Sequence, residues 1–220
     1  MIWEPLKLSA LVVCVSVLIV GMLGIFLGFV LAKGRFAGQE MLASLVTLPL
    51  VLPPTVTGYY LIVLLGRHGL LGEFLFELTG WTIAFTWQAA VVAAVVLSLP
   101  LMVLSARAAI ESVNPQYEIA SYTLGKSRLA TFFLISLPLA RRGILAGLVL
   151  SFTRALGEFG ATFMLAGNIP GRTQTMPLAI YEAVMSGDEK RAQLLALILT
   201  AISVAAVYLT KKKKKRSIRY

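Results

Sequence analysis

The sequence predicts an all-α, polytopic membrane protein with five transmembrane helices. Of its 220 residues, 58% are hydrophobic and only 14% are charged, and the mean hydropathy is +0.85. The apolar residues also occur in runs of roughly 20 or more, the length that a helix needs to cross a hydrocarbon core of about 30 Å. Soluble domains are about half apolar and a quarter charged, so this composition excludes an ordinary soluble enzyme.

Each apolar stretch is expected to form one helix, because a helix satisfies all of its own backbone polar groups within lipid. The predicted spans are Leu8–Ala32, Leu42–Leu65, Ile83–Val103, Gly143–Ala166 and Ala192–Leu209. The connections between them are short except for Ser105–Arg142, which is long enough to contain structure of its own. We therefore predict one transmembrane domain over residues 1–210 and a short basic tail over residues 211–220.

Two pairs of glycines lie four residues apart, Gly24 with Gly28 in the first span and Gly143 with Gly147 in the fourth. Glycines at this spacing let two membrane helices approach closely, so we expect packing contacts, either within the chain or at a dimer interface. Cys14, also in the first span, is the only cysteine. No disulfide and no thiolate metal site can therefore form within this chain.

The second predicted span is rich in helix-breaking residues, because Pro49, Pro53, Pro54 and Gly58 all fall within it. Each proline removes a backbone donor and frees a carbonyl one turn earlier, so a regular helix cannot run through this stretch. Irregular backbone at membrane depth is stable only against protein or beside a water-filled cavity. Two interpretations stay open: a kinked packing helix, or a helix whose Pro53 and Pro54 line a translocation path.

The net charge is +10, but seven of the basic residues lie in the tail, Lys211–Arg216 and Arg219. The surplus is therefore local, and it does not indicate a nucleic-acid-binding groove. Over the loops, 14 Lys and Arg residues fall on the side of Lys33 and the tail, and 5 fall on the opposite side. Positive residues concentrate on the cytoplasmic side of a membrane, so we expect the N-terminus outside and the C-terminus in the cytoplasm, near anionic lipid headgroups.

The long connection before the fourth span contains a recognisable spacing. Residues 118–125 read Glu-Ile-Ala-Ser-Tyr-Thr-Leu-Gly, and nine residues separate Gly125 from the sequence Ile135-Ser-Leu-Pro138. Small residues such as Ala120 and Ser121 allow another helix to approach closely, and Gly125 can turn the chain after a helix. An ordinary amphipathic loop helix is the plain alternative. The full spacing resembles the cytoplasmic "EAA" loop of ABC importer permeases.

This resemblance implies a coupling loop over about residues 112–138, whose short helix docks into a groove on a separate ATPase subunit. The pattern departs from the family at two positions, since Ile119 occupies the place of the family's glutamate and a serine replaces the second alanine. Lys126 and Arg128 would face the partner. The residues assigned to the ATPase-coupling loop are Glu118, Ala120, Ser121, Gly125, Lys126 and Arg128.

Arg154 and Glu158 fall within the fourth predicted span, where ionisable residues are costly and mark functional positions. At a separation of four residues they share one helix face and can form an ion pair, which lowers that cost. The pair either shapes the translocation path or its outer gate, or it is a structural salt bridge between packed helices. The candidate path or gate residues are Pro53, Pro54, Arg154, Gly157, Glu158 and Gly160.

The segment Arg154–Gly160, the proline-rich second span and the loop Gly167–Gly171 are similar to the oxyanion branch of the same permease family, and look most like its molybdate permeases. Sulfate/thiosulfate and tungstate permeases are close alternatives. The resemblance implies a type I ABC importer permease fold, a homodimer with the pathway at its interface, two ATP-binding ABC subunits and an extracytoplasmic oxyanion-binding protein. ATP and Mg would be used by the partner ATPase, and this subunit would bind no cofactor.

Neither a catalytic nor a metal site is expected, because His68 is the only histidine and no nucleophile–base set or paired carboxylates occur in the sequence. The chain is therefore predicted to be a non-enzymatic subunit of the cell membrane. A passive channel or a membrane anchor is the rival from another class. Such a protein would need no coupling loop, so the spacing from Glu118 to Pro138 argues against it.

Overall fold

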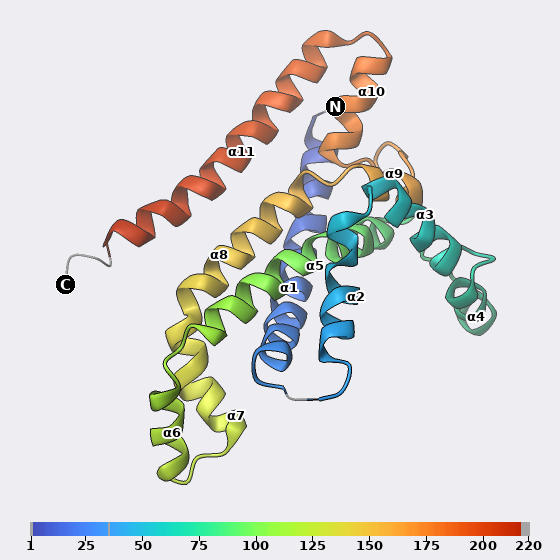
Figure 1. The fold of residues 1–220 in the computed structure, drawn as a ribbon. Coiled ribbons are helices and arrows are strands. Elements are labelled where there is room, and N and C mark those ends of the chain that lie inside the picture. The colour runs from blue at the N-terminus through green and yellow to red at the C-terminus, as the bar shows by residue number, and fades with distance from the viewer. Residues whose placement is uncertain (1, 35, 217–220) are drawn as a thin grey trace.

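The fold is built from helices around a central packed bundle (Figure 1). The computed structural model describes residues 2–34 and 36–216, and every regular element in this part of the chain is a helix. The elements are α1 (Trp3–Lys33), α2 (Gln39–Val51), α3 (Pro54–Leu65), α4 (Leu70–Thr79), α5 (Trp87–Glu111), α6 (Pro115–Thr123), α7 (Arg128–Thr131), the π-helix η1 (Phe132–Ser136), α8 (Leu137–Leu156), α9 (Gly160–Ala166), α10 (Met176–Met185) and α11 (Glu189–Arg216).

The long helices give the molecule two ends. The N-terminus and the turn between α10 and α11 lie at one end, and the α1–α2 connection and α6–α7 lie at the other (Figure 1). Helices α3 and α4 project sideways from the bundle, and α11 slants away from it toward the C-terminus. The segment α6–α7, which lies in the predicted coupling loop, therefore forms one end of the molecule.

Four helical stretches of the described chain are long and apolar enough to cross a membrane: α1, α5, the continuous stretch Arg128–Leu156, and α11. Helices α2 and α3 meet the same criterion only together, and they are bent by 116°. With this pair counted as one span, the predicted five are confirmed. The helices extend beyond the predicted limits, since α5 continues to Glu111 and α11 continues to Arg216, the last residue described.

The second span is two helices rather than one, and proline is the cause. Helix α2 ends at Val51, and the next two residues are extended, with ψ of 141° at Leu52 and 139° at Pro53. Pro54 occupies the first helical position of α3, where a missing N–H costs nothing because that group has no helical partner anyway. Residues before a proline are also driven out of the helical region.

The fourth span differs from the prediction at both ends. The continuous helical stretch begins at Arg128 and stops at Leu156, so the expected helix Gly143–Ala166 is wrong as a single element. Pro138 lies inside this stretch, two residues after the π-helix η1, a local departure from α-helical hydrogen bonding of the kind that accommodates an internal proline. The chain leaves the helix at Gly157, and Phe159, with φ −130° and ψ −58°, precedes the separate helix α9.

Close glycine contacts hold α1, α5 and α8 together as the central bundle. A methyl group on Gly28 of α1 would lie 2.7 Å from the Ala106 Cβ of α5, and one on Gly143 of α8 would lie 2.5 Å from the Ala109 Cβ. Real Cβ atoms do not approach so closely, so only glycine allows these helices their present spacing. Both predicted glycine pairs thus serve packing within the chain rather than a dimer interface.

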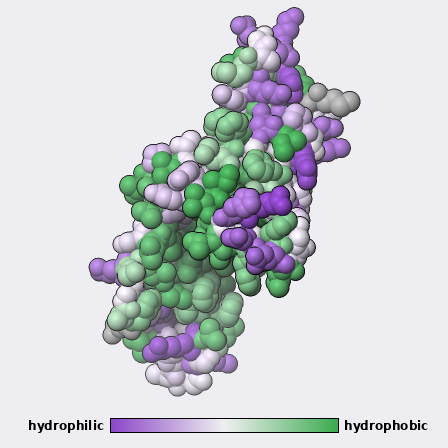
Figure 2. Space-filling model, turned by 90° about the vertical axis from the view of Figure 1, so that its right-hand side faces the viewer, coloured by the Kyte–Doolittle hydropathy of each residue, from purple (hydrophilic) through white to green (hydrophobic). Residues whose placement is uncertain are grey.

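The outer surface of the bundle is apolar, as lipid requires. Figure 2 shows hydrophobic residues over most of the visible face, with hydrophilic residues gathered toward the two ends and in one central cluster. On α1, Leu18, Met22 and Phe26 follow one another at four-residue intervals and are each more than 60% exposed. Such a stripe would be unusual on a soluble monomer and suits contact with acyl chains.

Candidate functional site

The two broken spans meet at their breaks. A methyl group on Gly160, the first residue of α9, would lie 3.1 Å from the Pro54 Cβ of α3, and one on Gly58 would lie 2.7 Å from the Ala161 Cα. The structure therefore brings together two motifs that are about a hundred residues apart in the sequence. Pro53, Pro54 and Gly157 remain exposed around this contact, so the irregular backbone faces outward from the single chain.

Arg154 and Glu158 form the predicted ion pair, with 2.6 Å between Arg154 Nη1 and Glu158 Oε2. They do not share one face of a continuous helix, because α8 ends between them. Glu158 instead folds back from the break, and its Oε1 accepts a hydrogen bond of 2.9 Å from the Ala161 N–H in the first turn of α9. The Glu158 side chain is 2% exposed and that of Arg154 is 28% exposed, so the arginine alone keeps an open side.

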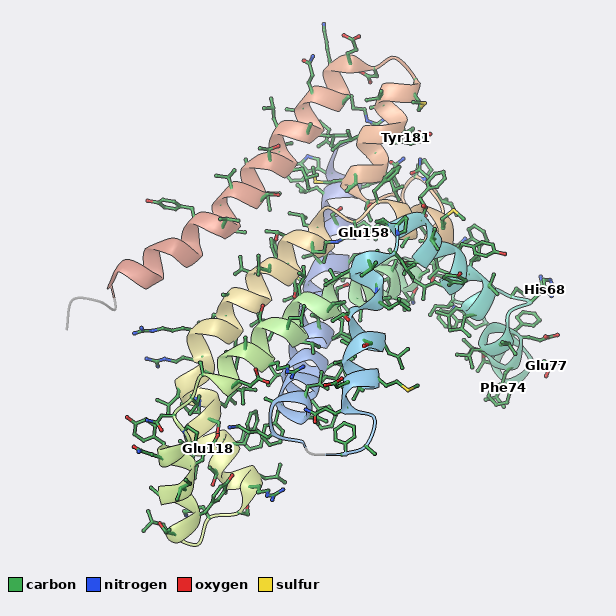
Figure 3. All side chains as sticks on the ribbon, in the orientation of Figure 1. His68, Phe74, Glu77, Glu118, Glu158 and Tyr181 are labelled. Carbon is green, nitrogen blue, oxygen red and sulfur yellow. The ribbon has the colours of Figure 1, made fainter. Side chains whose placement is uncertain are left out.

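Three aromatic rings lie beside this pair, and the sequence reasoning missed them. Phe159, Phe163 and Tyr181 pack together, with ring centroids 5.3–6.0 Å apart. Figure 3 places Tyr181 on α10 near Glu158, in the upper part of the molecule. Phe163 and Tyr181 are each 41% exposed. The spacing of Phe159 and Phe163 was visible next to Glu158, but the third ring comes from a helix that no local pattern connects to them.

The loop between α9 and α10 is held by its own polar side chains. Thr173 Oγ1 accepts a hydrogen bond from the Ile169 N–H, and Gln174 Nε2 donates to Asn168 Oδ1 and to Glu182 Oε2. Thr173 and Gln174 are buried. The loop is therefore a fixed structure that sets the position of α10 relative to α9.

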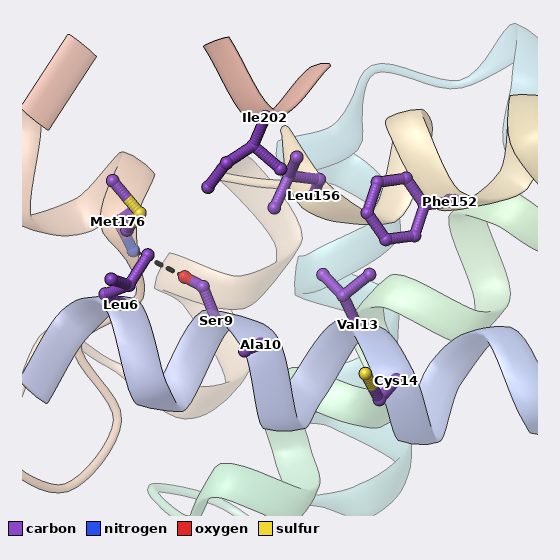
Figure 4. A pocket seen from close by; sticks show the side chains of 9 residues that line it. All are labelled: Leu6, Ser9, Ala10, Val13, Cys14, Phe152, Leu156, Met176 and Ile202. Atoms are coloured by element: carbon purple, nitrogen blue, oxygen red, sulfur yellow. Dashed lines mark hydrogen bonds between the residues drawn. The ribbon is translucent and has the colours of Figure 1, made fainter. Parts of the chain in front are cut away.

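A cavity of about 120 Å³ lies between α1, α8, α10 and α11 (Figure 4). None of its lining residues is charged, and the Ser9 hydroxyl already accepts a 2.8 Å hydrogen bond from the Met176 N–H. An anion would lose its hydration there without gaining a partner. The candidate anion path is therefore not this cavity. In the part of the chain that the structure describes, no group of three His, Cys, Asp or Glu side chains is placed to hold a metal ion.

The predicted coupling loop folds as a short helix that ends at Gly125. Asn114 caps the start of α6 through its side chain, which accepts a hydrogen bond from the Gln116 N–H. At the other end Gly125 has φ +76°, and the N–H groups of Gly125 and Lys126 donate to the carbonyls of Tyr122 and Ser121. This is the Schellman arrangement, in which glycine supplies the left-handed residue. The predicted turn at Gly125 is confirmed.

The residues assigned to this loop differ in exposure, and Glu118, Ala120 and Ser121 are the ones that lie on α6. Glu118 and Ser121 are buried toward the bundle, and Ser121 Oγ lies 2.9 Å from Thr131 Oγ1. Ala120, Gly125, Lys126 and Arg128 are exposed. Exposed apolar residues that the sequence reasoning did not single out accompany them: Tyr117, Ile119, Tyr122 and Leu124.

The two candidate regions are separate in space. Glu118 lies in the lower part of Figure 3 and Glu158 in its upper part. The outer face of α6 carries large apolar side chains, and Leu124 is 80% exposed. An apolar face of this kind, located at the end of a bundle, fits a protein partner. The break between α8 and α9 carries the charged pair and meets the break between α2 and α3, and irregular backbone at membrane depth is stable only against protein or beside a water-filled cavity.

Comparison with known proteins identifies the family of the chain. Residues 23–211 match the family described as "Binding-protein-dependent transport system inner membrane component". The molybdenum transport system permease protein ModB of Escherichia coli (strain K12) is 44% identical over 94% of this chain and 91% of its own length. ModB of Haemophilus influenzae is 40% identical over 96% of each chain. The sulfate transport system permease protein CysT of Salmonella typhimurium is 34% identical over 92% of this chain and 73% of its own.

Solved structures show the same fold. A bacterial ABC transporter involved in the import of the acidic polysaccharide alginate superimposes with a TM-score of 0.79 at 16% identity, over 97% of this chain and 78% of that one. At this identity the likeness concerns the fold alone. The sequence match over most of the chain, the apolar helices and this fold lead to one conclusion: the protein is a multi-pass membrane protein that belongs to the family of binding-protein-dependent transport system inner membrane components.

Proposed function

We propose that the chain is the permease subunit of an ATP-driven importer that moves molybdate into the cytoplasm by alternating access. The observation that carries the proposal is the 44% identity to a molybdenum transport permease over nearly the whole of both chains. The sulfate permease relative is less similar, at 34%. The subunit binds no nucleotide itself, and ATP and Mg are used by separate ATPase subunits.

The path for the anion runs past the two breaks, in a homodimer whose second copy faces the exposed side of Pro53 and Pro54. Arg154 supports this role because it offers a partly exposed guanidinium within a span. Its charge is balanced by Glu158, so an anion is attracted through the remaining N–H donors without being bound tightly. A transport path needs such weak binding, since a tight site would retain its cargo.

Two ATPase subunits dock on the two copies of α6, one on each. The exposed apolar side chains of Tyr117, Ile119, Tyr122 and Leu124 form the docking face, and Lys126 and Arg128 lie beside it. The anion-binding protein delivers its cargo at the opposite end, near the N-terminus and the α10–α11 turn. In this arrangement the N-terminus lies outside the cell and the C-terminus in the cytoplasm.

The test is uptake by the complete transporter in proteoliposomes, with its ATPase subunits and binding protein. Uptake of molybdate, tungstate and sulfate would be measured together with ATP hydrolysis. We expect molybdate, with tungstate as a second substrate, to be taken up and to stimulate hydrolysis. Stimulation by sulfate alone would reassign the protein to sulfate transport, and uptake that continues without ATP would refute the importer proposal altogether.

A matched pair of variants locates the anion path. Arg154→Lys keeps the positive charge in the span but loses the planar fork of donors. Arg107→Lys makes the same change in an exposed ion pair with Glu111 at the opposite end of the bundle. We expect the first to lower the rate of molybdate uptake severalfold and the second to leave it unchanged. Equal rates for both variants would remove Arg154 from the path.

A further inference from the structure

The side of α6 that faces the bundle is polar, which is unusual for a helix that must be held in place. Helix α6 is described throughout, and of its nine residues only Glu118 and Ser121 are buried. Its apolar side chains point away from the bundle instead. Because little apolar area joins α6 to the rest of the chain, hydrogen bonds and charge must fix its orientation.

Glu118 makes two of these contacts, and Ser121 makes a third with Thr131. Glu118 Oε2 lies 2.8 Å from Lys33 Nζ, in the last turn of α1. Its Oε1 accepts a 2.7 Å hydrogen bond from the Ser136 hydroxyl, immediately before α8. The side chains of Glu118 and Lys33 are 10% and 29% exposed, so water screens the pair only partly. Both carboxylate oxygens are therefore committed, each to a different helix.

These contacts complete a three-way junction at one end of the bundle. Helix α6 is joined covalently to α5 through the short connection 112–114, and Glu118 joins it to α1 and to the start of α8. The glycine contacts at Gly28 and Gly143 keep α1, α5 and α8 too closely packed to slide freely. A tilted ring contact between Phe29 of α1 and Phe132 of η1, with centroids 4.3 Å apart, reinforces the same junction.

We propose that Glu118, held by Lys33 and Ser136, is the positioning residue that locks α6 to the α1–α5–α8 bundle, so that a push on α6 moves the three helices together. The inference rests on the proposed function, in which an ATPase subunit delivers that push. Without the junction α6 would be held only by its chain connections to α5 and α7 and by the Ser121–Thr131 hydrogen bond, and it could tilt while the spans stayed still. ATP hydrolysis would then continue with little transport.

The functional test is the number of molybdate ions taken up per ATP hydrolysed in proteoliposomes. Lys33→Met leaves Glu118 charged and partly buried without its cation, so the double variant Lys33→Met/Glu118→Met is made beside it to keep the fold. We expect the single and the double variant, each provided that it assembles with the ATPase, to give a ratio at least tenfold lower than that of the parent. Lys33→Arg should keep the ratio of the parent. The control is Arg107→Ala/Glu111→Ala, which removes an exposed ion pair in the same half of the molecule and should keep the ratio.

A second measurement tests the junction without relying on transport. Ile119 is exposed on α6, so a spin label on Ile119→Cys, with the single native cysteine removed by Cys14→Ser, reports how firmly α6 is held. We expect the label to be more mobile in the Lys33→Met/Glu118→Met variant than in the parent, and unchanged in the control.

The two measurements separate the possible failures. An unaltered ratio in the double variant, or an unaltered spectrum of the label, would overturn the inference about Glu118 even if the parent protein transports molybdate. A parent complex that takes up no oxyanion would refute the proposed function, whereas the change in label mobility would still establish the junction.

Discussion

Removing Arg154 from the Arg154–Glu158 pair should destabilise the protein more than removing both charges, because Glu158 is the buried partner. Glu158 is 2% exposed and depends on two donors, Arg154 Nη1 at 2.6 Å and the Ala161 N–H at 2.9 Å. Taking one partner from a buried ion pair costs about 3–5 kcal/mol, because an uncompensated charge stays behind. We expect Arg154→Met to fall in this range.

Replacing Glu158 should destabilise the protein less than replacing Arg154. In Glu158→Gln the amide oxygen can still accept the Ala161 N–H, and Arg154, which is 28% exposed, can turn toward solvent or headgroups. The expected loss is about 1–3 kcal/mol, the usual cost of leaving a polar group without its partner. The double variant Arg154→Met/Glu158→Gln carries no buried charge, so it should recover about 2 kcal/mol relative to Arg154→Met, within the range of coupling energies between contacting residues.

Thermal unfolding of the purified protein in detergent measures these differences. A loss of 1 kcal/mol lowers the Tm by roughly 2–4 °C in a protein of this size, so Arg154→Met should melt roughly 10 °C below the parent. Arg107→Met is the control, because its partner Glu111 is 46% exposed and a pair of this kind contributes about 1 kcal/mol or less. A double variant that melts at the sum of the two single losses would refute the pairing as a source of stability.

Three further predictions concern the two candidate regions. Gly160→Val should cost about 1–3 kcal/mol and slow uptake, because its side chain would press on Pro54, 3.1 Å from the added Cβ, and a melting curve with an uptake assay checks both effects. Gly125→Val should weaken binding of the ATPase subunit through a strain of about 1–2 kcal/mol at φ +76°. Gly125→Asn should bind normally, because asparagine adopts the left-handed conformation far more readily than valine and nothing lies within 4 Å of the added Cβ; a titration of the two subunits distinguishes the variants. Leu124→Asp should abolish co-purification of the ATPase at an unchanged Tm. Leu70 on α4 is as exposed as Leu124, and Leu70→Asp should leave co-purification intact.

The span pattern and the turn at the coupling loop were predictable from local sequence. Long apolar runs specify membrane helices because the requirement is only for length and hydropathy. The turn at Gly125 was predictable because glycine adopts a left-handed backbone conformation almost without cost. The prolines likewise predicted an irregular second span, but not the 116° bend, whose size depends on what α3 packs against.

The contacts of the candidate regions depended on the tertiary structure. The pairing of Arg154 with Glu158 was predictable from their separation along the chain. The break at Gly157, however, turns Glu158 into a cap for α9, and it places Gly160 against α3, a contact that no local pattern predicts. The inward orientation of Glu118 was not predictable either, because its partner Lys33 is 85 residues away along the chain.

The sequence by itself therefore determined that this is a helical membrane protein, roughly where four of its five spans lie, and which segments carry charge or break the helices. These properties follow from hydropathy, from the backbone limits of proline and glycine, and from separations of a few residues. Only the tertiary structure decided which breaks meet, which face of α6 is buried, and which distant side chains pair with its carboxylate. Such contacts depend on how closely the helices pack, and the close approach of α1, α5 and α8 is a property of the bundle as a whole rather than of any single segment.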